Sequence, residues 1–127
     1  MIKKNPCNNL KWNNPKNVPT FGHTFSEHGQ KVSLESLKDR ARNKGHQIGQ
    51  FLDDQSAGLE LGKIAQEKGT GVWDIPLPPT LLKIRVVTET GEEVIADSMR
   101  VIVKLSGGIK TAFPFNSSLP TTITKVK

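Results

Sequence analysis

The hydrophobic residues in the first half of this chain recur at helical spacing. Ser33 is a favourable N-cap and Gly45 a favourable stop, so a helix is predicted between them. A second, longer helix is predicted to be capped by Asp53 or Asp54 and to end at Gly69. The stripes expected to be buried are Leu34, Leu37 and Ala41 in the first helix and Ala57, Leu61, Ile64 and Ala65 in the second.

The second half of the chain has the pattern of short strands separated by turns. A Pro-rich stretch at 76–79, a hairpin turn at 89–92 and Ser-Gly-Gly at 106–108 divide it. The predicted strands are residues 71–75, 81–88, 93–97, 99–105 and 109–115, and the short stretch 47–52 between the two helices could also be extended. N-terminal helices followed by an antiparallel sheet of four or five strands indicate an α+β domain and are incompatible with a doubly wound sheet.

A single domain is expected from the length of 127 residues. Residues 1–20 are rich in Asn, Pro and Lys without hydrophobic periodicity, which is typical of a linker or a lead-in from an upstream region. The folded unit is then expected over 21–116, followed by a flexible tail over 117–127. No apolar run approaches the ~20 residues of a membrane span. Cys7 is the only cysteine, so neither a disulfide framework nor a cysteine-based zinc site is expected.

The net charge of +6 favours a nucleic-acid partner, but the charges are unevenly placed. Four lysines in residues 1–20 and two in residues 121–127 account for all of it. Residues 21–120 hold 12 basic and 12 acidic side chains. A phosphate-binding surface in the folded unit therefore requires that positive side chains gather on one side of it.

Two of the three histidines lie close together, between Gly22 and Gly29. His23 and His28 could act as proton shuttles near neutral pH, and the flanking glycines permit tight turns and close approach of a ligand. On a helix the two side chains would point roughly 140° apart, and on a strand they would point to opposite faces, so a turn is needed to bring them together. A structural role for either histidine stays open. Thr24 has the spacing of a capping box with the glutamate three residues later and predicts one helical turn here.

Several cationic or aromatic side chains are candidates for substrate binding. Arg40 and Arg42 lie on the first long helix, where Lys38 and Lys44 extend the basic group, and Arg100 and Lys104 share one face of a predicted strand. Each could contact phosphate, and a solvated surface position is the simpler interpretation of each. Trp73 is expected in the core or as an anchor at a strand end, although an exposed indole could stack on a base.

The last predicted strand carries Lys110 and Thr111 next to each other. In a regular strand, neighbouring residues point to opposite faces, so both can face one cleft only if the strand is bulged.

Several motifs for catalysis are missing. The sequence has no P-loop, no nucleophile elbow, no zinc-deaminase signature and no cluster of carboxylates suited to Mg²⁺. No metal or cofactor is therefore expected, and the available chemistry is that of His, Lys, Thr and Ser side chains.

Four blocks of the sequence, in order, resemble the type 50 polymorphic toxins. The first is GHTFSEHG at 22–29, and the second is SLESLK at 33–38, followed by Arg40 and an alanine. IGQFLDDQ at 48–55 and KTAFP at 110–114 continue the match. Together the blocks extend over nearly the whole predicted folded unit.

The resemblance implies a fold of the barnase–EndoU–colicin–RelE type, in which N-terminal helices pack on an antiparallel sheet. Such domains form the C-terminal tips of large secreted effectors, including contact-dependent growth-inhibition proteins. The toxin would thus be secreted or delivered from a cell surface and would act in the cytoplasm of the target cell. Relatives of this fold are ribonucleases, many acting on transfer RNA, and each is neutralised by a cognate immunity protein. Some related toxins also borrow elongation factor Tu of the target cell.

By the same resemblance, His23, His28, Lys110 and Thr111 form the expected catalytic site. One histidine would deprotonate the ribose 2′-hydroxyl, and a second group would protonate the departing 5′-oxygen. Lys110, Arg100 or both would stabilise charge on the phosphoryl oxygens, and Thr111 would donate a hydrogen bond there. The products would be a 2′,3′-cyclic phosphate and a 5′-hydroxyl, formed without a metal.

Two alternative functions remain open from the sequence. One is a metal-dependent nuclease acting on DNA, with His23, Glu27 and His28 as the metal ligands. The other is a non-catalytic module that binds RNA or a protein through the basic ends of the chain. Chelation by EDTA separates the first from a metal-independent ribonuclease, and substitution of His28 separates the second.

Overall fold

The computed structural model describes residues 18–81 and 83–119. Its helices are α1 (Val18–Phe21), α2 (Thr24–His28), α3 (Leu34–Lys44) and α4 (Asp54–Lys68). The predicted ends of the two long helices are confirmed, because the side chains of Ser33 and Asp53 each accept a backbone N–H at the N-terminus, and Gly45 ends α3 in the left-handed region at φ 74°. α2 is the predicted single turn, but the predicted capping box at Thr24 is wrong, because the N-cap is His23 and no side chain caps the helix.

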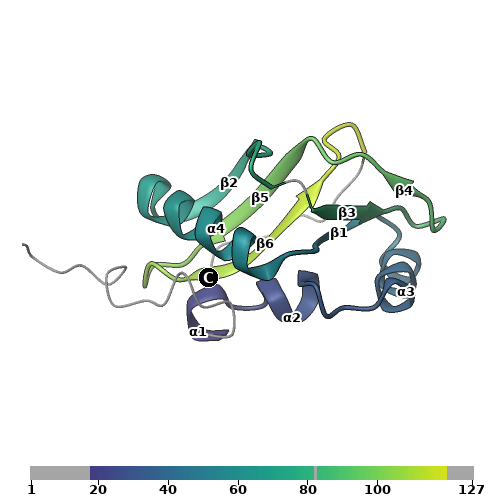
Figure 1. The fold of residues 1–127 in the computed structure, drawn as a ribbon, viewed down its shortest axis with the longest axis horizontal. Helices are drawn as coiled ribbons and strands as arrows, with labels where there is room; N and C mark the ends of the chain where they lie inside the picture. The colour runs from purple at the N-terminus through teal and green to yellow at the C-terminus, as the bar shows by residue number, and fades with distance from the viewer. Residues whose placement is uncertain (1–17, 82, 120–127) are drawn as a thin grey trace, which may run out of the picture.

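Six strands in the described residues form two three-stranded antiparallel sheets, with the orders β1-β3-β4 and β2-β5-β6. They are β1 (Ile48–Phe51), β2 (Gly71–Pro76), β3 (Ile84–Val87), β4 (Glu93–Val94), β5 (Ser98–Val103) and β6 (Ile109–Phe115). The predicted α+β class and antiparallel pairing are confirmed. Figure 1 shows α4 across the second sheet and α1, α2 and α3 below the strands.

The strands differ from the expected single sheet of four or five strands. The additional strand is β1, which lies within the 47–52 stretch expected to be extended and pairs with β3. β1 also contacts β6 of the other sheet. No ladder joins these two strands in the described residues, and Pro114 of β6 has no N–H to donate to one. β3 and β4 are shorter than the predicted 81–88 and 93–97.

The predicted borders of the folded unit fall at the edges of the described residues. The expected lead-in, 1–20, lies outside them except for 18–20, which form α1 together with Phe21. Of the expected tail, the structure describes 117–119. There the backbone N–H and the hydroxyl of Ser117 donate to the Asp97 carboxylate at 2.9 and 2.8 Å.

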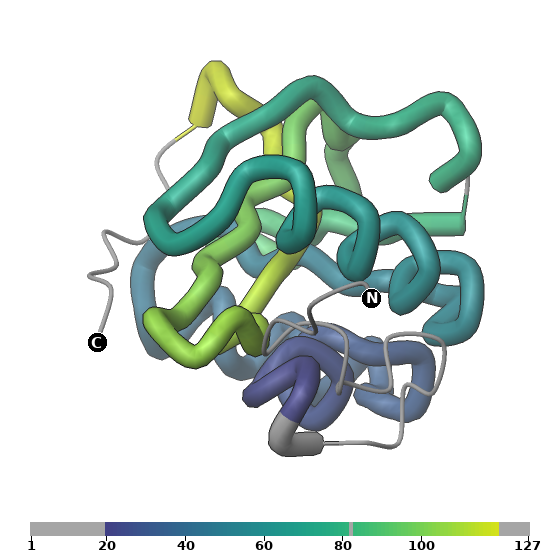
Figure 2. The backbone as a smooth tube through the Cα atoms, turned by 90° about the vertical axis from the view of Figure 1, so that its left-hand side faces the viewer, coloured from purple at the N-terminus to yellow at the C-terminus, as the bar shows by residue number. Residues whose placement is uncertain are grey.

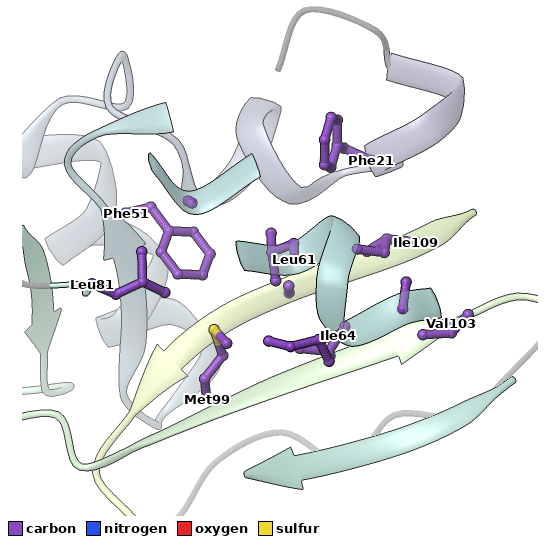
Figure 3. Packing of buried hydrophobic residues seen from close by; sticks show 12 residues of the cluster. Phe21, Phe51, Leu61, Ile64, Leu81, Met99, Val103 and Ile109 are labelled. Carbon is purple, nitrogen blue, oxygen red and sulfur yellow. The ribbon is translucent and has the colours of Figure 1, made fainter. Parts of the chain in front are cut away.

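The main hydrophobic core lies between α4 and the β2-β5-β6 sheet (Figure 3). Its labelled members include Leu61 and Ile64 of α4, Met99 and Val103 of β5, and Ile109 of β6. A smaller cluster, Leu37, Ala41, Ile48 and Val87, holds α3 on β1 and β3. Figure 2 shows α1 and α2, in purple and blue, as a separate layer below the strands and α4. A close backbone contact at Gly22 sets how near this layer lies to β6.

A β-bulge at Lys110 decides which way β6 presents its side chains. Ile102 pairs with Thr111, whereas the next residue of β5, Val103, pairs with Ile109, so Lys110 is the extra residue. As a result, Ile109 joins the core together with Ala112, while Thr111 is turned to the other face. The condition that the sequence set for Lys110 and Thr111 to face one cleft is met.

Candidate active site

One pocket of about 200 Å³ gathers all four residues of the expected catalytic site, His23, His28, Lys110 and Thr111. Residues from α2 and the turn before it form one wall, and the C-terminal half of α3 forms another. The start of β1 and the bulged end of β6 complete the lining. Four segments that are distant in the sequence therefore meet at this point.

His28, the last residue of α2, is buried in the wall of the pocket. Its Nδ1 lies 2.7 Å from the carbonyl oxygen of Gly49, and its ring packs 5.1 Å from the ring of Phe113. Because a carbonyl oxygen only accepts hydrogen bonds, Nδ1 carries the proton. In the neutral ring, Nε2 is then left as a proton acceptor.

The surroundings of His28 keep its ring neutral. Burial is the largest cause and lowers the pKa of His28 from 6.5 to about 4, against the opposing effect of the hydrogen bond to Gly49. The positive charges of Arg40 and Lys44 lower the pKa further. A neutral imidazole beside two cations is suited to accept a proton in the presence of an anionic ligand.

Gly22 brings His23 against β6. The backbone N–H of His23 donates to the carbonyl oxygen of Lys110 at 2.9 Å. Gly22 has φ +58°, and a Cβ built on it would lie 2.1 Å from that same oxygen. Only glycine allows this approach, which places the exposed His23 beside the bulge.

Gly49 likewise allows two backbone segments, β1 and β6, to lie close together on the other side of the pocket. A Cβ built on it would lie 1.8 Å from the carbonyl oxygen of Pro114, so β1 can lie this close to β6 only with glycine at this position. The carbonyl of the same residue holds His28. The backbone of His23 and the imidazole of His28 are thus each held by a hydrogen bond next to a close approach that requires glycine.

Thr111 presents a buried hydroxyl that has no hydrogen-bond partner among the described residues. Buried polar atoms are rarely left without a partner, and such an atom in a pocket wall is a candidate for binding a ligand. Lys110 lines the same pocket from the bulge. The structure therefore offers a cation and a hydroxyl from consecutive residues.

Positive charge is gathered at the pocket although residues 21–120 as a whole are neutral. Its lining includes Arg40, Lys44 and Lys110, against a single carboxylate, that of Glu27. One Nη of Arg40 donates to the backbone carbonyl oxygen of Glu27, which fixes the guanidinium. The segregation of charge that a phosphate-binding surface requires is present here.

Sequence reasoning did not select several residues of this pocket. Lys44 was noted in the basic group of the first long helix but not placed among the substrate-binding residues. It lies four residues after Arg40 on α3, so helical periodicity would have placed the two on one face. His46 and Phe113 reach the pocket through the packing of β1 and β6. No local sequence pattern predicts the packing of β1 against β6.

The other predicted substrate-binding residues do not line this pocket. Arg42 pairs with Asp39 at 2.7 Å on an exposed face of α3. Arg100 forms a two-pronged ion pair with Asp74 at 2.7 and 2.9 Å.

Trp73 lies in β2 and Lys104 directly follows β5, both away from the pocket. The indole of Trp73 is half-buried, and its N–H donates to the carbonyl of Gly69 at 2.9 Å. The backbone of Lys104 closes the turn to β6. The anchoring of a strand end that the sequence expected for Trp73 matches these contacts.

No group of three or more His, Cys, Asp and Glu side chains in the described residues is arranged to hold a metal ion. The set His23, Glu27 and His28 therefore lines one pocket without forming a metal-binding arrangement. Within residues 18–81 and 83–119, no helix has the length and apolar character needed to span a membrane.

Comparisons of the chain with protein-family models, with curated proteins and with solved structures gave no match.

Proposed function

We propose that this chain is a metal-independent endoribonuclease that cleaves its substrate through a 2′,3′-cyclic phosphate. The observation that carries the proposal is the single pocket in which a neutral, buried His28 lies with His23, Lys110 and Thr111. These are the side chains needed for transfer of a phosphoryl group to a ribose hydroxyl: a base, an acid and donors to the phosphate.

In the proposed reaction, Nε2 of His28 takes the proton of the ribose 2′-hydroxyl, and the 2′-oxygen attacks the adjacent phosphorus. The bond from phosphorus to the 5′-oxygen breaks, and His23 gives that oxygen a proton. The hydrogen bond from Nδ1 to Gly49 orients the imidazole of His28 throughout. The products are a 2′,3′-cyclic phosphate and a free 5′-hydroxyl.

The charge that develops on the phosphoryl oxygens is stabilised by Lys110 and by the hydroxyl of Thr111. Arg40 takes the role that was expected for Arg100, because Arg40 lines the pocket while Arg100 is held by Asp74. Removal of a general acid or base lowers rates by roughly 10²–10⁴-fold.

The biological setting of this proposal rests on the resemblance of four sequence blocks to the type 50 polymorphic toxins. We propose an antibacterial toxin domain with a barnase–EndoU–colicin–RelE type of fold, delivered to target cells by a larger secreted effector. Its substrate would be transfer RNA, its inhibitor a cognate immunity protein, and elongation factor Tu of the target cell a possible helper.

The test is incubation of the purified chain with total cellular RNA in excess EDTA, followed by sequencing of the new RNA ends. The matched variant is His28→Asn, which keeps a donor for the Gly49 carbonyl but has no ring nitrogen to accept a proton. The control is Lys63→Gln, because Lys63 is exposed on α4. We expect discrete cuts in transfer RNA ending in cyclic phosphate, made by the wild type and the control and lost in His28→Asn.

Cleavage abolished by EDTA would instead identify a metal-dependent nuclease. No cleavage even after addition of target-cell extract, which supplies a missing factor, would overturn the ribonuclease proposal in favour of a binding module.

A further inference from the structure

A second hollow lies next to the proposed active site. Its volume is about 490 Å³, and it is lined by residues of α2, of the following loop and of the first two turns of α3. Arg40 lines both this groove and the active-site pocket. The two cavities therefore share one wall, and that wall carries a positive charge.

The lining of the groove suits a phosphodiester. It includes the cations Lys31 and Arg40 and the hydroxyls of Ser33 and Ser36, without a carboxylate. The Ser26 hydroxyl also lines the groove but donates to the His23 carbonyl oxygen at 3.4 Å. The oxygen of the Ser33 hydroxyl accepts the N–H of Ser36 at 3.1 Å, which leaves its O–H free to donate elsewhere. Cations and hydroxyl donors together are the usual partners of phosphate oxygens.

The guanidinium of Arg40 is held at the border between the two cavities. One Nη is bound to the Glu27 carbonyl, while the Nε–H is buried without a hydrogen-bond partner in the described residues. An orphaned donor on a fixed cation, between two hollows, is a feature that an anionic ligand would satisfy.

We propose that this groove is a subsite for the phosphodiester that neighbours the cleaved one. The substrate is then an RNA strand long enough to place one phosphate in the active-site pocket and the next beside Lys31, Ser33 and Ser36, with Arg40 between them. Phe25 and Val32 supply apolar surface in the groove for the intervening nucleoside. This inference rests on the proposed ribonuclease function for the pocket.

The experiment compares a dinucleotide with a hexanucleotide of the same base as substrates. For the wild type we expect kcat/KM to be higher for the hexanucleotide. The double variant Lys31→Gln/Ser36→Ala should reduce this preference roughly 10-fold, which corresponds to the loss of one charge-assisted contact. Lys63→Gln serves as the control, since it removes an exposed charge outside both cavities. Thermal unfolding checks that both variants are folded.

Binding is measured separately with a 2′-O-methyl hexanucleotide, which lacks the attacking hydroxyl. We expect the double variant to bind it roughly 10-fold more weakly than the control does. Cleavage with the same length preference in the double variant would overturn the subsite and leave the ribonuclease proposal standing. Weakened binding in the double variant without any cleavage by the wild type would identify the groove as a phosphate-binding site but overturn both the ribonuclease and a subsite next to a cleaved bond. Binding by neither protein would overturn the subsite.

Discussion

At the scale of single residues, the environment of His28 sets the pH range in which the proposed base works. A general base acts only when deprotonated, and burial with two nearby cations lowers the pKa of His28 to about 4. We therefore expect the acid limb of the kcat/KM profile to lie near pH 4, far below the 6.5 of an ordinary histidine. A limb near 6.5 would contradict the assignment of His28 as the base.

A bound phosphate should raise the pKa of His28 part of the way back toward 6.5. The anion offsets the charges of Arg40 and Lys44, which now lower the pKa of His28. Titration of the His28 ring by NMR should then give a higher pKa with a 2′-O-methyl dinucleotide bound than without it. An unchanged pKa would place the ligand away from the ring.

The hydroxyl of Thr111 offers a test in which activity and stability respond differently. Its oxygen is buried without a partner in the described residues, so Thr111→Val should leave the free energy of unfolding unchanged or raise it slightly. If the hydroxyl donates to the reacting phosphate, kcat should fall ~10²-fold. Thr111→Ser keeps the donor and should retain most of the activity. A loss of stability matching the loss of rate would indicate a structural role instead.

At the scale of the elements, Gly22 holds the short helices against β6. Gly22→Ala combines a left-handed backbone with a Cβ 2.1 Å from the Lys110 carbonyl oxygen. Gly45→Ala is the matched control, because Gly45 has φ +74° and open space around it. We expect the control to lose about 1–2 kcal/mol of unfolding free energy and Gly22→Ala to lose more, together with activity. Urea denaturation measures both, and equal losses would mean that the close approach is unimportant.

The elements also show what the sequence could and could not predict. The ends of α3 and α4 follow from residues within one turn of each end, such as Ser33, Asp53 and Gly45, and the limits of β6 were predicted in full. The division into two sheets depends on how β1 lies against β6, which no local pattern encodes. The bulge at Lys110 could be stated only as a condition, because the pairing partner of a strand fixes its register.

The candidate site was predicted to a similar extent. The two short blocks that contain His23, His28, Lys110 and Thr111 were selected from the sequence, and the structure brings them to one pocket. Arg40 of α3 was selected as well and lines the pocket, whereas the contribution of the start of β1 comes from tertiary packing and was not predicted. Arg100 and Lys104 were expected on one strand face, but Lys104 lies just after the end of β5, and both lie outside the pocket because a strand pattern does not predict which elements pack against the strand.

At the scale of the whole molecule, a buried neutral histidine makes stability depend on pH. The unfolded chain binds a proton at His28 with a pKa of 6.5, whereas the folded protein does so only near 4. The stabilisation is thus complete above 6.5 and is lost as the pH falls toward 4, by about 3 kcal/mol. Urea unfolding at several pH values should show this loss for the wild type beyond that of His28→Asn. Parallel curves for the two proteins would contradict burial of a neutral ring.

The distribution of charge over the molecule decides how it can hold a polyanion. Four lysines lie in residues 1–20, whereas the folded unit is neutral overall but gathers Lys31, Arg40, Lys44 and Lys110 at the two cavities. If the cavities supply the phosphate contacts, the affinity for a short single strand falls with salt by a slope of about 0.7 for each contact.

A comparison of two full-length variants separates the two sources of charge. Lys31→Gln/Lys44→Gln removes two cations from the cavities, and Lys3→Gln/Lys4→Gln/Lys11→Gln/Lys16→Gln removes all four from residues 1–20. For a 2′-O-methyl hexanucleotide we expect the first variant to flatten the salt dependence by about 1.4 and the second to leave it unchanged. The opposite result would move RNA binding to the N-terminal lysines. In that case the N-terminal lysines would bind the RNA. The cations of the pocket would then contact only the phosphate that reacts.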